Sequence, residues 1–203
     1  MLTIKTWRTP ATEYPDRTLG RARIKTIRYR GFYRCYGLRG HRYFRAGNIR
    51  VKRLLIGGQG WMIDDPPHWW AMEEHATFYQ GRVLVAGLGL GLIVHTLHAN
   101  PAVQQIVVIE REKDVIDLVS PFMPHGKLEI LHGDFWDYAG PTPDGVFFDL
   151  LVGNGYALLP DALVAYSQML QWFPSATIRI HGYNNKMFEP IGRAIQEAIR
   201  AYR

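Results

Sequence analysis

A glycine turn and an acid downstream of it have the residue types and the spacing needed to bind a nucleoside. The turn is Gly87-Leu88-Gly89-Leu90-Gly91, and Glu110 follows nineteen residues after its last glycine. Glycines allow a backbone turn to pass close beneath a ligand, because no Cβ stands in the way. An acid about 20 residues further on can accept hydrogen bonds from both ribose hydroxyls. The alternative interpretation is a glycine turn that serves only close packing of a helix against a strand.

The elements that must position this turn are a strand, a helix and a second strand. Val83 to Ala86 and Ile106 to Ile109 are short apolar runs, which are typical of buried strands. Between them, apolar residues from Leu90 to Leu97 fall at positions i, i+3, i+4 and i+7, which predicts a helix that ends at Asn100-Pro101.

Strands and helices continue to alternate through the rest of the chain. Further strands are expected at 127–131, 145–151 and 176–180, and helices at 71–79, 112–120, 161–173 and 190–202. This alternation predicts an α/β fold with a Rossmann-like, doubly wound and mostly parallel sheet. Right-handed crossovers would then place the glycine turn, Glu110, Asp134 and Asp149 together at one rim, outside the carboxyl ends of the strands.

Charge divides the chain into regions. Residues 1–53 hold fifteen Lys or Arg against Glu13 and Asp16, whereas the remaining 150 residues carry 9 basic and 16 acidic groups. We therefore expect a small basic N-terminal antiparallel β-unit (1–60), an acidic and Trp-rich connecting loop and helix (61–80), and a Rossmann-like domain (81–203).

The basic unit is expected to consist of short strands between Arg21 and Ile56, with a bulge near Thr26-Ile27 and a hairpin turn at Gly37 to Gly40. Its cations are interleaved with aromatic residues, as on nucleic-acid-binding surfaces where cations hold phosphates and rings stack on bases. The alternative is a solvated strand face whose cations discourage edge-to-edge pairing, and the lack of a recognisable nucleic-acid motif favours it.

Composition excludes several classes of protein. The chain has 203 residues, of which 47% are hydrophobic, as in a globular protein. No stretch approaches the roughly 20 apolar residues of a membrane span, and the N-terminus lacks the apolar core of a signal peptide. Cys35 is the only cysteine, so no disulfide can form within the chain and a cytoplasmic location is the simplest expectation.

Residues 82–151 resemble the cofactor half of class I S-adenosylmethionine-dependent methyltransferases, and within them the spermidine-synthase-like branch. Four segments carry the resemblance: VLVAGLGLG, VVIE, LHGDFWD and GVFFDLL. The segment WMIDDPPHWWAMEEHATFYQG also lies where spermidine synthases carry an acidic turn and helix after an N-terminal β-unit. The resemblance implies strand order 3-2-1-4-5. Strands 6 and 7 are not expected, because the chain ends one helix after the fifth strand, whose exposed edge would need cover from the N-terminal unit or from a second subunit in a homo-oligomer.

The resemblance also implies a role for individual residues in binding S-adenosylmethionine. The glycine turn would approach the methionine portion, the acid of the second motif the ribose, and the Asp-Phe pair of the third motif the adenine. Glu110 and Asp134 could instead be helix caps or solvated turn acids. The implied cofactor-binding residues are Gly87, Leu88, Gly89, Gly91, Glu110, Asp134, Phe135 and Asp149.

Asp149 is the expected catalytic residue, because the resemblance places it beside the sulfonium and the incoming nucleophile. A carboxylate near this fixed cation stabilises it without needing a proton. The candidates for the substrate side are Asp64, Asp65, His75 and His181. No metal is expected, since His95 and His98 lack further ligands.

The function that this pattern predicts is an S-adenosylmethionine-dependent transferase, most simply a methyltransferase with a small-molecule acceptor. Aminopropyl transfer from decarboxylated S-adenosylmethionine is an alternative, but Leu150-Leu151-Val152-Gly153-Asn154 stands where spermidine synthases carry a second acid that helps to hold the polyamine. An NAD-binding enzyme and a non-enzymatic nucleic-acid-binding or assembly protein are further alternatives.

Overall fold

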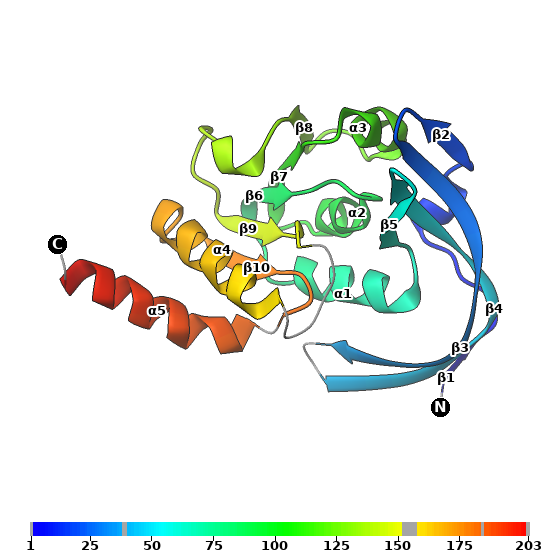
Figure 1. The fold of residues 1–203 in the computed structure, drawn as a ribbon, viewed down its shortest axis with the longest axis horizontal. Coiled ribbons are helices and arrows are strands. Elements are labelled where there is room, and N and C mark those ends of the chain that lie inside the picture. The colour runs from blue at the N-terminus through cyan, green and yellow to red at the C-terminus, as the bar shows by residue number, and fades with distance from the viewer. Residues whose placement is uncertain (1, 38–39, 152–157, 184, 202–203) are drawn as a thin grey trace.

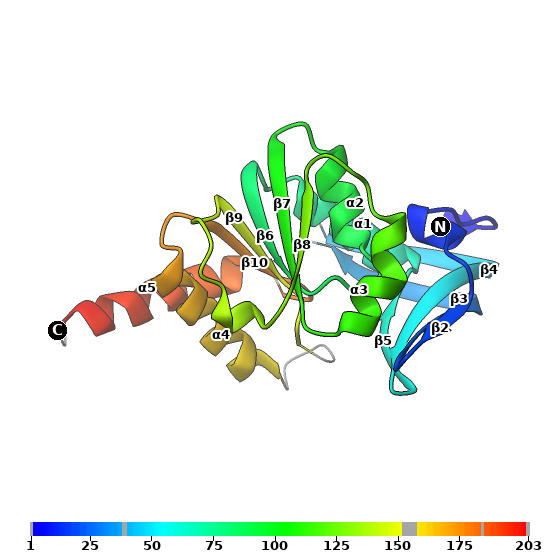
Figure 2. The ribbon, with the colours of Figure 1, turned by 90° about the horizontal axis from the view of Figure 1, so that it is seen from above.

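The structure of the chain, a computed structural model, describes residues 2–37, 40–151, 158–183 and 185–201. Two five-stranded sheets organise these residues, and helices lie between the sheets and on the far side of the second one (Figures 1 and 2). The N-terminal sheet contains β1 (Leu2–Ile4), β2 (Arg17–Leu19), β3 (Ala22–Gly37), β4 (Gly40–Ile56) and β5 (Gln59–Ile63). The C-terminal sheet contains β6 (Gly81–Ala86), β7 (Val103–Glu110), β8 (Leu128–His132), β9 (Gly145–Phe148) and β10 (Thr177–Ile180). The helices are α1 (Pro66–Ala76), α2 (Leu92–Ala99), α3 (Lys113–Val119), α4 (Leu159–Trp172) and α5 (Asn185–Ala201), with short 3-10 turns η1 (Pro10–Glu13), η2 (Ser120–Phe122) and η3 (Phe135–Asp137).

The C-terminal sheet is parallel throughout, in the order β10-β9-β6-β7-β8, so the predicted α/β class with a parallel sheet is confirmed. Alternate residues of its central strands enter two different cores. Val83 and Val85 pack with α1, α2 and α3 on one face, whereas Leu84 and Ala86 pack with α4 and α5 on the other. Because all five strands run the same way, their carboxyl ends lie at one edge of the sheet.

Several predicted element boundaries were wrong. The connecting helix begins at Pro66 rather than at residue 71, because Asp65 caps its N-terminus and a proline suits the first helical position. β9 ends at Phe148, three residues earlier than expected, where the chain leaves the ladder. α5 begins at Asn185 and contains Pro190, which was expected to start it.

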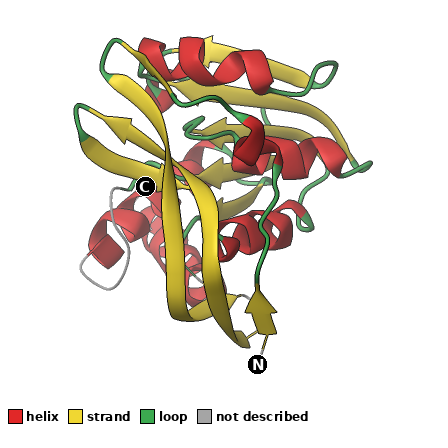
Figure 3. Ribbon diagram, turned by 90° about the vertical axis from the view of Figure 1, so that its right-hand side faces the viewer, coloured by secondary structure: helices red, strands yellow, loops and turns green. Residues whose placement is uncertain are grey.

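The N-terminal sheet is built on one long hairpin of β3 and β4 that curves around α1 and α3 (Figure 3). The sequence predicted short strands and purely antiparallel pairing, but β3 and β4 have 16 and 17 residues and β1 pairs parallel to β4. The bulge lies between Tyr29 and Gly31 rather than near Thr26-Ile27. The apparent slip in the pattern has another cause: Ile24 packs into the core shared with α1, α2 and α3, whereas Ile27 packs into a separate cluster that also includes Trp70 of α1.

Candidate active site

A cleft of about 310 Å³ lies at the carboxyl ends of the parallel strands. Six of the eight predicted cofactor-binding residues line it, from segments that are distant in the sequence: Gly87, Gly89, Glu110, Asp134, Phe135 and Asp149. The other lining residues are Trp61, Met62, Ile109, Arg111, Glu112, Gly133, Trp136, Leu150 and Leu151. The remaining residues of the Leu150–Asn154 segment, from position 152 onward, lie outside the described part of the chain.

Glu110 is fixed by the backbone on both sides. Its Oε2 accepts a hydrogen bond from the Leu88 N–H at 2.8 Å, and its Oε1 accepts one from the Glu112 N–H at 2.8 Å. The last residue of β7 therefore holds the glycine turn that follows β6. A carboxylate has about four acceptor positions, so two remain for ligand donors.

The side chains of Leu150 and Met62 lie close against the glycine turn. Gly87 and Gly89 have positive φ angles of 92° and 53°, which disfavour any residue with a side chain. A Cβ on Gly87 would lie 3.1 Å from the Leu150 side chain, and one on Gly89 would lie 2.6 Å from the Met62 sulfur. Met62, which belongs to β5 of the N-terminal sheet, also accepts the Leu90 N–H through its sulfur at 3.2 Å.

Two predicted members of the glycine motif do not line the cleft. The Leu88 side chain is buried in the core, so only its backbone faces Glu110. Gly91 caps α2 in a left-handed conformation with φ 70°, and a Cβ there would meet Met123 rather than the cleft. Gly91 thus serves close packing at the start of the helix.

The third-motif segment brings two aromatic rings to the cleft, those of Phe135 and Trp136. Asp134 caps the turn η3 by accepting the Trp136 N–H at 3.0 Å, as the cap interpretation predicted, and it also lines the cleft. Phe135 is only 2% exposed and packs edge-on against Phe148. Trp136, which the sequence argument did not select, is the more exposed ring of the pair, and a flat base could lie against it.

A cluster of histidines and acids adjoins Asp149 at the same edge of the sheet. His68, at the start of α1, was not selected from the sequence. Its Nδ1 lies 2.6 Å from Oδ1 of Asp65, which also caps the helix, and its ring centre lies 5.7 Å from that of His181. His181 directly follows β10, and its Nδ1 is buried without a hydrogen-bond partner among the described residues.

Electrostatics separates the two histidines of this cluster. Burial lowers the pKa of His68, but the hydrogen bond to Asp65 and the charges of Asp65 and Asp149 outweigh burial, so its pKa is raised above the ordinary value. Burial keeps the pKa of His181 below the ordinary value, although the charge of Asp149 opposes this shift. His68 is therefore the better proton acceptor of the two near neutral pH.

The two remaining substrate-side candidates have structural contacts instead. Asp64 is fully buried, and its Oδ2 accepts the Thr9 hydroxyl at 2.6 Å while its carbonyl accepts the Trp7 indole N–H. Burial raises the pKa of Asp64 to about 7. His75 is buried against Phe147 and accepts the Arg179 Nε–H at 3.1 Å. These contacts tie the N-terminal arm and the sheet to α1, away from the cleft.

The residues of the cleft fit S-adenosylmethionine. Its volume is at the lower end of the range usual for small-molecule sites, and Gly87 and Gly89 line it without side chains. Four acids line the cleft, which suits a cation: Glu110, Glu112, Asp134 and Asp149. Among the described residues there is no group of three or more His, Cys, Asp or Glu placed to hold a metal, and no helix long and apolar enough to cross a membrane.

No protein-family model matches the chain, and no curated protein sequence matches it significantly. Solved structures with a partly similar fold include a dimethyladenosine transferase from Plasmodium falciparum, with 16% identity, a TM-score of 0.41 and coverage of 57% of this chain and 41% of that one. Another is the plantazolicin methyltransferase BpumL in complex with SAH, with 16% identity, a TM-score of 0.39 and coverage of 54% and 44%. The chain thus spans less than half the length of these proteins. Both are methyltransferases, but similarity at this level carries no functional assignment.

Proposed function

We propose that the chain is an S-adenosylmethionine-dependent methyltransferase whose cofactor binds in the cleft above the glycine turn. The observation that carries the proposal is the position of Glu110, which bridges the glycine turn and the end of the neighbouring strand while keeping two acceptor positions for ribose hydroxyls. When bound, the cofactor would supply an electrophilic methyl group on a positively charged sulfur.

The other cleft residues have complementary roles in this proposal. Trp136 would lie along the adenine, and Asp134 would accept a hydrogen bond from its amino group. Asp149 would lie beside the sulfonium, where its charge favours the cation. Leu150 and Leu151 line the cleft next to Asp149, so the site offers apolar surface where a polyamine would need a second acid. This supports methyl transfer rather than aminopropyl transfer.

The cluster beside Asp149 would form the acceptor side of the site. With Nδ1 of His68 engaged by Asp65, its Nε2 is left to take the proton from an acceptor O–H or N–H group as the new bond to carbon forms. A neutral nucleophile becomes positively charged when it is methylated. Methyl transfer to it therefore requires a proton acceptor such as His68. A small molecule that reaches Asp149 and His68 is the substrate class proposed.

Isothermal titration calorimetry with S-adenosylmethionine tests the proposal. The wild-type chain should bind with a Kd in the micromolar range. Glu110→Gln keeps one carbonyl acceptor but removes the charge, and it should weaken binding at least tenfold because charged acceptors make stronger hydrogen bonds. The matched control is Glu129→Gln, an exposed acid on β8 outside the cleft. Binding of NADH with no response to S-adenosylmethionine, or equal affinity in wild type and Glu110→Gln, would contradict the assignment.

A further inference from the structure

The N-terminal sheet carries a concentration of positive charge. Between Asp16 and Asp64 the sequence has thirteen Lys or Arg and no Asp or Glu. Seven of these cations lie on the hairpin with exposed side chains, and we call them the basic exterior: Arg23, Lys25, Arg28, Arg30, Arg45, Arg50 and Arg53. Among the described residues, none of the seven has an acid within ion-pair distance.

Cations of the basic exterior face each other directly across the hairpin. Lys25 is opposite Arg53, and Arg28 is opposite Arg50. Directly opposed like charges destabilise a strand pair. The two pairs are three residues apart, about 10 Å along the strands, and they lie on opposite faces of the hairpin because successive side chains alternate between its faces. A solvated surface that only discourages edge pairing does not require this arrangement, because charges staggered along the strands would serve as well.

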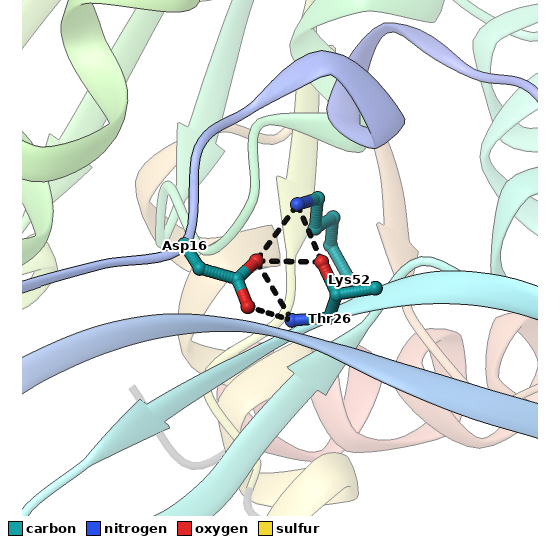
Figure 4. A network of polar contacts seen from close by, with 3 residues as sticks. All are labelled: Asp16, Thr26 and Lys52. Atoms are coloured by element: carbon teal, nitrogen blue, oxygen red, sulfur yellow. Dashed lines mark hydrogen bonds and ion pairs between the residues drawn. The ribbon is translucent and has the colours of Figure 1, made fainter.

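Lys52, on the same hairpin, is a cation with a structural role. Its side chain is buried, and its ammonium group donates to Asp16 at 2.9 Å and to the Thr26 hydroxyl at 2.7 Å (Figure 4). These contacts help to lower the pKa of Asp16 to about 2, against the effect of its desolvation. The one acid at the start of the hairpin is therefore already paired, and the basic exterior is left to solvent.

Aromatic side chains accompany the exposed cations. Phe32 is 67% exposed, and the Arg45 guanidinium lies 5.5 Å from its ring centre, directly across the two strands. Trp61, on β5, is 42% exposed and lines the cleft. Exposed rings beside cations are the arrangement on which unpaired bases stack while their phosphates are neutralised.

The basic exterior also reaches the cleft. The guanidinium of Arg53 lies over Gly60, the residue before Trp61, so closely that a Cβ on Gly60 would meet it. On the opposite margin, Arg21 approaches Glu112, which lines the cleft, at 3.8 Å. A strand of phosphates that follows the hairpin would therefore arrive at the cleft mouth.

We propose that the face of the hairpin that carries Arg23, Lys25 and Arg53 binds single-stranded nucleic acid and leads it toward the cleft. Phosphates contact these cations, and a base stacks on Trp61. Binding of this kind is driven largely by the release of counterions and therefore weakens steeply with salt. The proposal does not depend on the cofactor, because the surface lies on a different sheet from the glycine turn.

Fluorescence anisotropy of a labelled single-stranded oligonucleotide, titrated with the full chain over a range of KCl concentrations, tests the proposal. Two double variants each remove one opposed pair: Lys25→Gln/Arg53→Gln and Arg28→Gln/Arg50→Gln. The first should lower the affinity at low salt about tenfold or more, and should reduce the slope of log K against log salt by about 1.4, since each phosphate contact contributes about 0.7 for single strands. The second removes cations of the opposite face, and it should reduce the affinity and the slope less. The thermal midpoint of each variant should be unchanged or higher, because opposed like charges are removed.

The matched control is Lys113→Gln/Arg193→Gln, which removes two exposed cations outside the N-terminal sheet. It should leave the slope unchanged, and the duplex of the same sequence should bind more weakly than the single strand. Equal losses in the control, or binding that is insensitive to salt, would overturn the proposal. So would phosphatidylserine vesicles that bind as tightly as the oligonucleotide and displace it, since the surface would then fit a membrane instead. All arms are run without S-adenosylmethionine, so the outcome is separate from that of the cofactor titration.

Discussion

The cleft and the basic exterior of the N-terminal sheet place their charges in opposite ways. In the cleft, Glu110 and Asp134 each accept backbone N–H groups, so their carboxylates are held in fixed positions before any ligand arrives. On the exterior, Lys25 lies opposite Arg53 and Arg28 lies opposite Arg50. Among the described residues, no acid lies within ion-pair distance of these four cations. Fixed acids can meet a cation without reorganising, whereas unpaired cations gain most from a partner that replaces their counterions. The contrast indicates a small cationic ligand for the first region and a large polyanion for the second.

The largest effect is expected at the glycine turn, where the cofactor would approach the backbone closely. Gly89→Ala places a Cβ at a φ of 53° and 2.6 Å from the Met62 sulfur. We expect at least a 100-fold loss of affinity for S-adenosylmethionine by calorimetry, together with a loss of stability of about 1 to 2 kcal/mol. Gly126→Ala is the control, because Gly126 also has a positive φ, of 94°, but a Cβ added there would have no atom within 4 Å and would lie outside the cleft. Similar affinity losses in both variants would show that backbone strain alone, rather than the cleft, explains the effect.

A second prediction concerns Asp64, the buried acid at the junction of the two regions. Its folded-state pKa of about 7 lies above the ordinary value of 3.8, so the folded chain holds this proton more tightly than the unfolded chain does. The contribution of Asp64 to the free energy of unfolding is therefore greatest below about pH 4 and falls as the pH rises to about 7. Asp64→Asn should make the chain more stable than wild type at pH 8, by roughly 1 to 3 kcal/mol, and change it little at pH 4.

Urea denaturation of both proteins across this pH range measures the difference. Asp137→Asn, which changes an exposed acid, should show no such pH-dependent gain. If Asp64→Asn were less stable than wild type at pH 8, the junction would hold a charged carboxylate after all.

The smallest expected effect is on the titration of His68. The hydrogen bond from its Nδ1 to Asp65 and the charges of Asp65 and Asp149 raise its pKa despite its burial. Asp65→Asn keeps the helix cap, since asparagine caps as well as aspartate, but it should lower the pKa of His68, as measured by NMR of the imidazole nitrogens. The signal of His132, which lies near Arg111 rather than Asp65, serves as the internal control. An unchanged His68 titration in the variant would remove the basis for its proposed role as proton acceptor.

The sequence located the fixed acids but missed the histidine beside them, for a physical reason. Glu110, Asp134 and Asp149 each come at or after the end of a parallel strand, and the topology alone brings such positions to one edge of a sheet. The position of His68 depends on the Asp65 cap that begins α1 and on the packing of that helix beside β9 and β10, which are over 75 residues away along the chain. No local pattern encodes such a contact.

Other features depend in the same way on contacts that no local pattern encodes. Trp136 is more exposed than Phe135, which also lines the cleft, because the 3-10 turn η3 sets which side chain faces outward. The bulge was placed near Thr26 because the hydrophobic pattern changes there, but the cause is a change of packing partner along one strand. Met62 could not be selected, since an isolated methionine in a strand gives no sign of the loop that it covers.

The contact between the Met62 sulfur and the Leu90 N–H joins the two sheets at the point where both proposed ligands would arrive. Any movement of β5 on binding at the exterior would change the cover of the glycine turn, and a ligand in the turn would in the same way press on β5. Thermodynamic linkage makes such an influence reciprocal, so the two ligands would alter each other's affinity by the same factor. The Met62 thioether would then couple binding on the N-terminal sheet to binding at the glycine turn.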